Sequence, residues 1–351
     1  MYPALAILQA VQARASVLEC LWVCGEGDLE VDLVKRERIP FVTIPAAGIH
    51  GVGWRLPANL LRLWRGFFAA RNHLDRFKPE VLLFTGGYLA VPVALAGRHI
   101  PSLLYVPDIE PGLALRTLAL FADRICLIAE ESRRFFKKRA AVEVTGHPTR
   151  SALQGWNNEA ARQILRLDPG LPTLLVFGGS KGARSINRAV LAVLEKLLSF
   201  CQVIHISGSL DWPEVLSRSE KLDEFLRQRY QVFPYLHEEM GAAYSAADLI
   251  LSRAGASSIG EFPLYGKPAI LVPYPHAWRY QKVNADYLVA HGAARMLPDD
   301  RLQADLVGTV QEIILDEGLR NRMAEAMRSL GRTDPAATIA GYLFEMAGGR
   351  V

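Results

Sequence analysis

The sequence has few cysteines, and their positions do not suggest a metal site. Its four cysteines lie in apolar runs typical of strands, without the paired spacing that zinc ligands need. This pattern argues against a zinc site and indicates buried free thiols in a reducing compartment. The four residues are Cys20, Cys24, Cys126 and Cys201.

The sequence also lacks a long uninterrupted hydrophobic run and a strong charge of either sign. The longest uncharged run, residues 81–97, is broken by Gly86, Gly87 and Pro92, so it predicts a strand, a loop and a helix rather than a membrane span. The net charge of +4 is too weak to predict nucleic-acid binding. Anionic substrates and an anionic membrane surface remain as candidate partners.

Short aliphatic runs alternate with helix-length segments along all 351 residues. This alternation is typical of parallel sheets covered by helices on both faces, and the length favours two domains. We therefore predict an α/β fold of two doubly wound domains, residues 1–152 and 153–335. The boundary is placed between "TGHPTR" and "PTLLVFGGS", where turn residues flank a short helix.

The chain opens with "MYPALAILQA", which predicts a half-buried helix over residues 3–13. In a doubly wound domain a central strand and a ligand-binding loop normally stand before the first helix. Losing such a strand removes about five buried apolar side chains at ~1.5–3 kcal/mol each, which approaches the ~5–15 kcal/mol stability of a domain. We therefore expect the natural product to extend upstream of Met1.

Two segments of the second half carry signals for binding a nucleotide. The first, "LLVFGGSKGARSIN" at residues 174–187, places Gly178, Gly179 and Gly182 between a strand and a helix. Such a turn lets backbone N–H groups approach a phosphate at the helix N-terminus, although glycine also serves plain tight packing.

The second segment, residues 252–285, has a run of small residues that opens a helix carrying Glu261. A carboxylate at the carboxyl end of a sheet can accept hydrogen bonds from both ribose hydroxyls. The alternative is that Glu261 only stabilises a helix N-terminus.

Together these motifs resemble the MurG family of glycosyltransferases. The motifs "YPALAI", "FTGGYLAVP", "EPGLALR", "VTGHPTR", "FGGSKGARSIN", "SRAGASSIGE" and "GKPAILVPYPHA" occur in the family's order and spacing over nearly the whole chain. The resemblance implies a GT-B fold, in which two Rossmann-like domains enclose the active site between them. It also implies that a final helix, residues 336–347, packs back on the first domain, and that the first strand and glycine loop are missing from this chain.

The resemblance assigns roles in binding the donor, UDP-N-acetylglucosamine. It places Ser180 on the diphosphate, Gln281 on the sugar hydroxyls and Arg150 at the domain junction. Arginine suits the last position because a guanidinium can hold an oxyanion or stack on uracil; the alternative is a surface arginine at a strand end. The segment along the nucleoside, with its carboxylate on the ribose, is Ala256, Ser257, Ser258, Ile259, Gly260 and Glu261.

The chain departs from the family on the acceptor side. The histidine before "YPALA", proposed in the family as a catalytic base or supporting residue, is absent, so no catalytic residue is assigned. The family's "EQN" is "VPD" here, which puts Asp108 in place of an asparagine, and Tyr280 precedes Gln281. The Asp108 carboxylate either orients the acceptor or removes a proton from its hydroxyl.

The implied reaction is inverting transfer of N-acetylglucosamine from UDP to the muramyl 4-hydroxyl of lipid I, which gives lipid II in peptidoglycan synthesis. Two alternatives stay open: a related transferase acting on another lipid, and an inactive protein that binds a UDP-sugar. UDP-sugar epimerases share the architecture, but the ordered motifs fit them less well. No cofactor, metal ion or nucleic acid is expected.

Residues 55–76, "RLPANLLRLWRGFFAARNHLDR", combine apolar and aromatic residues with five arginines. A helix of this composition can lie among anionic lipid headgroups, or it can pack on a core with a solvated basic face. The family's acceptor is a polyprenyl-diphosphate lipid. The resemblance therefore favours the membrane-bound alternative, with the protein peripheral on the cytoplasmic face of the cell membrane.

Overall fold

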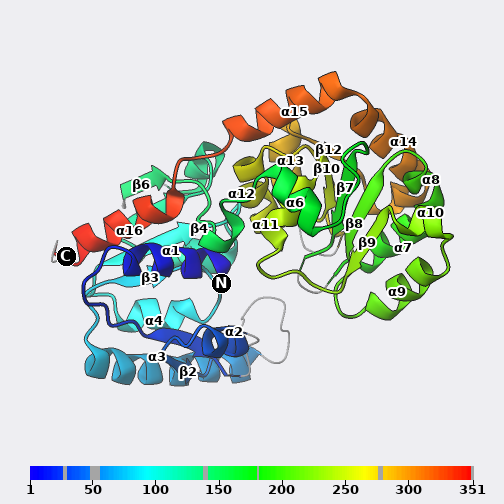
Figure 1. Ribbon diagram of the computed structural model, residues 1–351. Coiled ribbons are helices and arrows are strands. Elements are labelled where there is room, and N and C mark those ends of the chain that lie inside the picture. Colours follow the sequence, from blue (N-terminus) through cyan, green and yellow to red (C-terminus); the bar gives the residue numbers. More distant parts are fainter. Residues whose placement is uncertain (27–29, 48–55, 137–140, 180–181, 276–279, 349–351) are drawn as a thin grey trace. The chain divides into compact units, whose positions relative to one another are not determined.

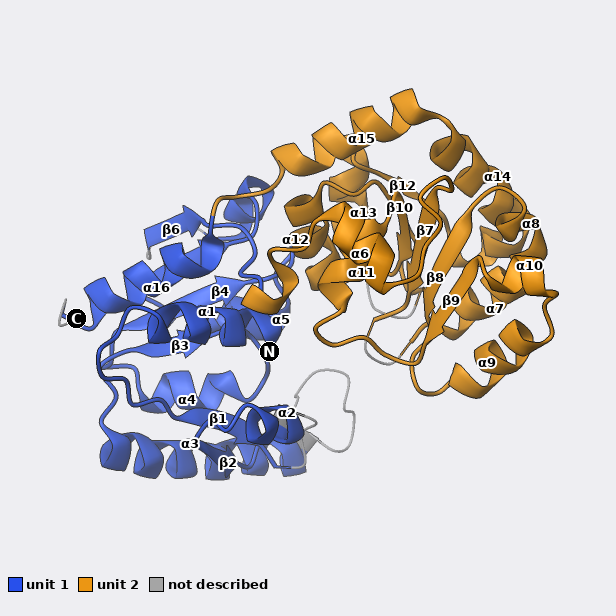
Figure 2. Cartoon of the chain, in the orientation of Figure 1, with its two compact units in different colours: residues 1–149, 334–351 blue, residues 150–333 orange. Residues whose placement is uncertain are grey.

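The chain forms two compact units in this computed structural model, which describes residues 1–26, 30–47, 56–136, 141–179, 182–275 and 280–348. Unit 1 holds Met1–Thr149 together with Asp334–Val351, and unit 2 holds Arg150–Thr333 (Figure 2). The boundary predicted after residue 152 falls within a short 3-10 helix, η3 (Ser151–Leu153), at the start of unit 2.

Unit 1 consists of parallel strands and the helices that connect and cover them. Its strands are β1 (Trp22–Gly25), β2 (Phe41–Ile44), β3 (Leu82–Phe84), β4 (Ser102–Val106), β5 (Arg124–Leu127) and β6 (Ala141–Val144). Its helices are α1 (Tyr2–Gln12), α2 (Glu30–Arg36), α3 (Leu56–Phe77), α4 (Ala90–Ala96), α5 (Leu113–Leu118), η2 (Glu130–Phe135) and α16 (Pro335–Met346).

The strands of unit 1 form two sheets, β1-β2 and β3-β4-β5-β6. A cavity of about 390 Å³ lies between them, lined by Trp22 and Val23 of β1 and by Leu83 and Phe84 of β3.

Helices α1 and α16 lie side by side on one face of the larger sheet (Figure 1). Ile7 of α1 and Ile339 of α16 are fully buried in one cluster with Leu103 and Tyr105 of β4. The alternate residues of β4, such as Leu104, belong to the cluster on the opposite face. Strand β4 is thus buried on both sides, as expected of a central strand in a parallel sheet.

Unit 2 repeats the same architecture with its own strands and helices. Its strands are β7 (Thr173–Phe177), β8 (Gln202–Ile206), β9 (Tyr230–Phe233), β10 (Leu249–Ser252), β11 (Ala269–Leu271) and β12 (Ala294–Met296). Besides η3, its helices are α6 (Asn158–Ile164), α7 (Arg184–Ala192), α8 (Leu194–Leu198), α9 (Trp212–Glu220), α10 (Glu224–Arg227), α11 (Met240–Ala246), α12 (Ala256–Tyr265), α13 (Tyr280–Ala290), η4 (Asp299–Arg301), α14 (Leu302–Leu315) and α15 (Glu317–Ser329).

The sheet of unit 2 has the parallel order β12-β11-β10-β7-β8-β9. The chain starts at β7 in the middle, continues outward through β8 and β9, and then returns to the other side of β7 as β10. The order of strands therefore reverses between β7 and β10. Ligands of open α/β sheets bind outside the carboxyl ends of the strands at such a point.

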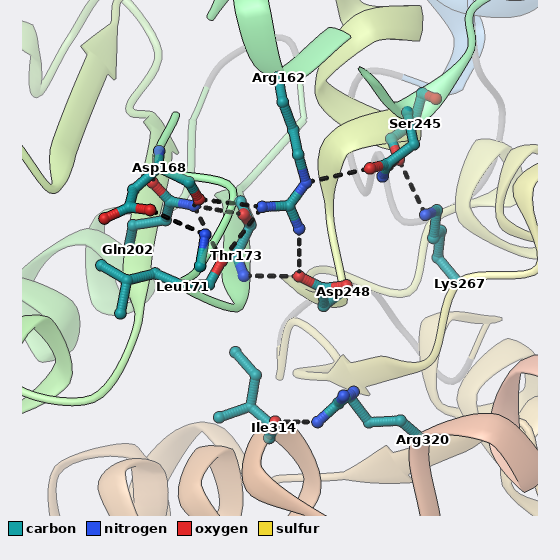
Figure 3. A network of polar contacts seen from close by, with 12 residues as sticks. Arg162, Asp168, Leu171, Thr173, Gln202, Ser245, Asp248, Lys267, Ile314 and Arg320 are labelled. Atoms are coloured by element: carbon teal, nitrogen blue, oxygen red, sulfur yellow. Dashed lines mark hydrogen bonds and ion pairs between the residues drawn. The ribbon is translucent and has the colours of Figure 1, made fainter. Parts of the chain in front are cut away.

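The amino ends of the same strands are held by a network of polar contacts (Figure 3). Arg162 of α6 donates to a carboxylate oxygen of Asp248, just before β10, at 2.8 Å. The same oxygen accepts from the backbone N–H of Thr173 in β7 at 2.8 Å. Gln202 of β8 donates to the Thr173 hydroxyl at 3.0 Å and to backbone carbonyls of the loop before β7. These contacts fix the edge of the sheet opposite to the predicted ligand side.

Two details differ from the sequence-based expectations. Strand β12 is not predicted, because it is a short edge strand that carries the exposed Arg295. The sequence "VLECLWVCG" at residues 17–25 predicts a strand over its whole length, but β1 begins only at Trp22, and Val17 is exposed. Of the four cysteines, three are buried as expected and Cys20 is only half-buried; all four are free thiols.

Candidate functional site

The two predicted donor-binding segments follow neighbouring strands of unit 2. Phe177, the last residue of β7, pairs with Ser252, the last residue of β10. Gly178 and Arg253 therefore leave the sheet next to each other, and each chain then enters a helix, α7 or α12. The pairing brings two helix N-termini to the point where the strand order reverses, and helix N-termini favour anions there.

The glycine loop approaches the backbone of the next strand closely. Gly182 has φ +78°, and a Cβ atom at this position would lie 2.2 Å from the carbonyl oxygen of Ser207, just after β8. Gly179 has φ +88° but open space around it. The loop can therefore carry a side chain at neither position without strain, and at Gly182 there is no room for one. Ser180, expected on the diphosphate, lies outside the described residues.

A buried polar cluster connects α7 to β8 and the loop that follows it. Asn187 donates to the Ser207 carbonyl and to the Asp211 carboxylate, both at 2.8 Å. His205 contacts the Asn187 side-chain oxygen at 3.0 Å and the Tyr230 hydroxyl at 2.7 Å. Burial lowers the pKa of His205 to about 3, so this imidazole is neutral at physiological pH. His205 is fully buried within unit 2.

Glu261 lies buried on α12, with only 8% of its surface exposed. The Tyr244 hydroxyl of α11 donates to its carboxylate at 2.7 Å. Burial raises the pKa of Glu261, while the Tyr244 hydrogen bond and the positive charge of Arg150 act in the opposite direction. Tyr244 and Arg150 thus both act on one buried carboxylate, that of Glu261.

Arg253 connects both segments of the site. Its guanidinium donates to the Asp299 carboxylate at 2.5 Å and to the Ser185 hydroxyl, in the first turn of α7, at 2.6 Å. It also lies over the Tyr274 ring, with 5.2 Å between the guanidinium carbon and the ring centroid. Arg253 therefore ties the start of α7 to the loops after β10 and β11.

Gln281 and Ser258 are held by the backbone around Arg253. The Gln281 side-chain oxygen accepts from the backbone N–H of Tyr274 at 2.8 Å, which leaves its amide NH₂ group to serve as a donor. The Ser258 hydroxyl donates to the Arg253 carbonyl at 2.8 Å. Gln281 thus stands at the start of α13, beside the loop that Arg253 contacts.

The remaining predicted residues divide between the units. At the start of α12, Ala256, Ser257 and Gly260 are half-buried, whereas Ile259 is buried. Asp108 belongs to unit 1, half-buried on the loop after β4.

Neither Arg253 nor Tyr244 is among the site residues predicted from the sequence. Arg253 stands inside the quoted motif "SRAGASSIGE", but its partners Ser185 and Asp299 are remote in sequence. Tyr244 stands among small residues in "GAAYSAA", where a buried hydroxyl needs a partner that the sequence does not reveal.

Comparisons with known proteins assign the family. The glycosyltransferase family 28 N-terminal domain matches residues 1–127, and the family 28 C-terminal domain matches residues 173–339. The chain belongs to glycosyltransferase family 28. Family 28 membership makes it a hexosyltransferase, and the resemblance to MurG is confirmed.

Curated family 28 relatives extend over nearly the whole chain. One from Prosthecochloris aestuarii is 39% identical, with 99% of this chain and 96% of the relative covered. Another from Roseiflexus sp. is 35% identical, with 98% and 91% covered. Both are named UDP-N-acetylglucosamine--N-acetylmuramyl-(pentapeptide) pyrophosphoryl-undecaprenol N-acetylglucosamine transferase.

Solved structures confirm the two-domain α/β fold. The crystal structure of Acinetobacter baumannii MurG matches with a TM-score of 0.77 at 23% identity, covering 98% of this chain and 95% of that one. The crystal structure of UDP-GlcNAc 2-epimerase from Neisseria meningitidis matches with a TM-score of 0.67 at 14% identity, covering 97% and 95%. The transferase and the epimerase thus share this fold.

Helix α3 of unit 1 covers most of the predicted residues 55–76 and packs on the core through one face. Gly66 and Ala70 are buried, and a Cβ atom on Gly66 would lie 2.2 Å from the Pro45 carbonyl oxygen. Another face is exposed and apolar; its exposed fractions are Leu60 50%, Leu61 49%, Trp64 62% and Phe68 47%. Arg55 and the side chain of Leu56 lie outside the described residues. No helix within the described ranges is both long and apolar enough to cross a membrane.

The crowding around Gly182 leads to a testable difference between two glycines of one loop. Gly179→Ala requires a left-handed alanine but meets no atom, so we expect a loss of about 1–2 kcal/mol in the free energy of unfolding. Gly182→Ala adds a collision with the Ser207 carbonyl, so we expect a clearly larger loss. Chemical denaturation of both variants measures the difference, and equal losses would contradict this account of the loop.

Proposed function

We propose that the protein transfers N-acetylglucosamine from UDP to the muramyl 4-hydroxyl of the lipid-linked precursor lipid I. Its family 28 relatives are named as N-acetylglucosamine transferases that use UDP-N-acetylglucosamine and an undecaprenyl-linked muramyl substrate. The observation that carries this proposal is the buried Glu261 carboxylate on α12, the helix that follows β10 where this strand pairs with β7. A carboxylate there suits two ribose hydroxyls, and the helix N-termini suit a diphosphate.

In this proposal unit 2 holds the donor through a few polar groups. The backbone of the glycine loop and Ser180 bind the diphosphate, and Gln281 binds the sugar hydroxyls through its NH₂ group. The start of α12, residues 256–261, lies along the nucleoside, with Glu261 on the ribose. Arg150 stabilises the ionised Glu261 and attracts the anionic donor.

The reaction is a displacement at the anomeric carbon. The acceptor oxygen forms a bond to this carbon while the bond to the β-phosphate oxygen breaks, and that electron pair leaves with UDP. The N-termini of α7 and α12 stabilise the negative charge that develops on the leaving group. The acceptor hydroxyl gives its proton to a base, and we assign Asp108 to the acceptor side, where its carboxylate orients this hydroxyl.

We further propose that unit 1 rests on the cytoplasmic face of the cell membrane through α3, where a polyprenyl-diphosphate acceptor is anchored. Two observations support this. The exposed face of α3 holds the rings of Trp64 and Phe68, whose centroids are 4.7 Å apart. Exposed arginines, among them Arg62 and Arg65, belong to the same helix and suit anionic headgroups.

The donor site is tested by Glu261→Gln. Loss of a charge-assisted acceptor costs about 1.5–3 kcal/mol, so we expect UDP-N-acetylglucosamine to bind roughly ten- to a hundredfold more weakly in calorimetry. Glu312→Gln, which removes an exposed carboxylate paired with Arg295 in the same unit, is the matched control and should bind as the wild type does.

Wild-type affinity in Glu261→Gln would show that the Glu261 carboxylate does not bind the donor. A transfer assay with lipid I then separates the candidate functions. Donor binding without transfer to lipid I would contradict the proposed reaction and favour another lipid acceptor or an inactive binding protein.

The membrane contact is tested by Trp64→Ala and Phe68→Ala in flotation with vesicles containing anionic lipid. Each ring contributes about 1.5 kcal/mol on burial in the interface, so each variant should partition roughly tenfold less. Phe225→Ala on α10 removes an equally exposed ring from unit 2 and should float like the wild type. Equal recovery of all three variants would exclude α3 as the contact.

A further inference from the structure

Tyr244 of α11 is fixed in orientation by a group of aromatic rings. Its ring centroid lies 5.8 Å from that of Phe177, 5.9 Å from that of Phe262 and 5.3 Å from that of Tyr265. Phe177 ends β7 directly before the glycine loop, and the other two belong to α12. Tyr244 therefore packs against both segments of the donor site.

The hydroxyl of this fixed ring donates to the Glu261 carboxylate at 2.7 Å, and both side chains are buried. A carboxylate oxygen that accepts from Tyr244 still has a lone pair, and the second oxygen has two. The hydrogen bond thus orients the carboxylate and leaves lone pairs on both oxygens to accept further hydrogen bonds. Tyr265 does not compete for the carboxylate, because its own hydroxyl donates to the Leu153 carbonyl.

We propose that Tyr244 is a positioning residue of the donor site: it holds the Glu261 carboxylate ionised and oriented to accept the ribose hydroxyls of a uridine diphosphate sugar. This inference rests on the proposed function. Tyr244 touches no reacting atom, and it acts only through Glu261.

The ionisation state of Glu261 gives the inference a measurable signature. Besides Tyr244 and Glu261 themselves, two titratable or charged groups act on this buried pair: Tyr265 from α12 and Arg150 from the segment before η3. The Tyr244 hydrogen bond lowers the pKa of Glu261, against the effect of burial. Without the hydroxyl the carboxylate should hold its proton to a higher pH, and a protonated carboxyl accepts fewer hydrogen bonds.

The experiment is the affinity for UDP-N-acetylglucosamine as a function of pH in Tyr244→Phe. Both phosphates of this donor are diesterified, so its charge is constant across the neutral range. We expect the pH midpoint of binding to move upward by about one to two units, as expected for the loss of one hydrogen bond to a charged group. Binding should then recover toward the wild-type affinity as the pH rises.

Two further variants make the result specific. Tyr244→Phe combined with Glu261→Gln should bind weakly with no such pH dependence, because the titrating group is gone. Tyr105→Phe is the matched control: Tyr105 is also fully buried and bonds to His147 at 2.9 Å, but it belongs to unit 1. It should leave the pH midpoint unchanged.

A wild-type midpoint in a folded Tyr244→Phe variant, with the donor still bound, would overturn this inference and leave the proposed function intact. Failure of the wild type to bind the donor would overturn both. If the variant does not fold, a ¹³C NMR titration of the wild type decides, with the Glu261 carboxyl signal identified by its loss in Glu261→Gln. A Glu261 that stays protonated through the neutral range would contradict the inference.

Discussion

The pairing of β7 with β10 is the constraint on which the candidate site depends. Phe177 and Ser252 are the last paired residues of these strands, and each is followed by a loop that opens a helix. If β10 did not pair with β7, at least one other strand would separate the glycine loop from the start of α12. Arg253 could then not contact Ser185. The proposed donor site is therefore a consequence of strand order.

The candidate site also depends on the burial of one carboxylate, that of Glu261. Taking an ionised carboxylate out of water is costly unless hydrogen bonds and opposite charge replace its hydration. Tyr244 and Arg150 supply these in unit 2, and neither is close to Glu261 in sequence. In the proposed site, a carboxylate prepared in this way accepts ribose hydroxyls without reorganising, since its partners are already in place. The network of Arg162 and Asp248 at the opposite edge of the sheet joins α6 to the amino ends of the strands.

Much of the fold around the candidate site could be predicted from the sequence, because the informative signals are local. The apolar runs of β7 and β10 and the glycines after them are contiguous, so the strands, the loop and the positions of α7 and α12 follow from pattern. Strand β12 escapes prediction because Arg295 faces solvent at an edge. The contacts of Arg253 and Tyr244 escape it because they join segments that only the fold brings together. For α3 the two patterns overlap on one helix, and burial alone separates the face with Gly66 from the face with Trp64.

Hydrogen–deuterium exchange of the chain with and without saturating UDP-N-acetylglucosamine tests the central claim most directly. The account predicts slower exchange at the backbone amides around the N-termini of α7 and α12, residues 182–187 and 255–260. Exchange of the α3 backbone amides should not change. Protection of only one of the two segments, or of neither, would contradict a donor site built where β7 and β10 end side by side.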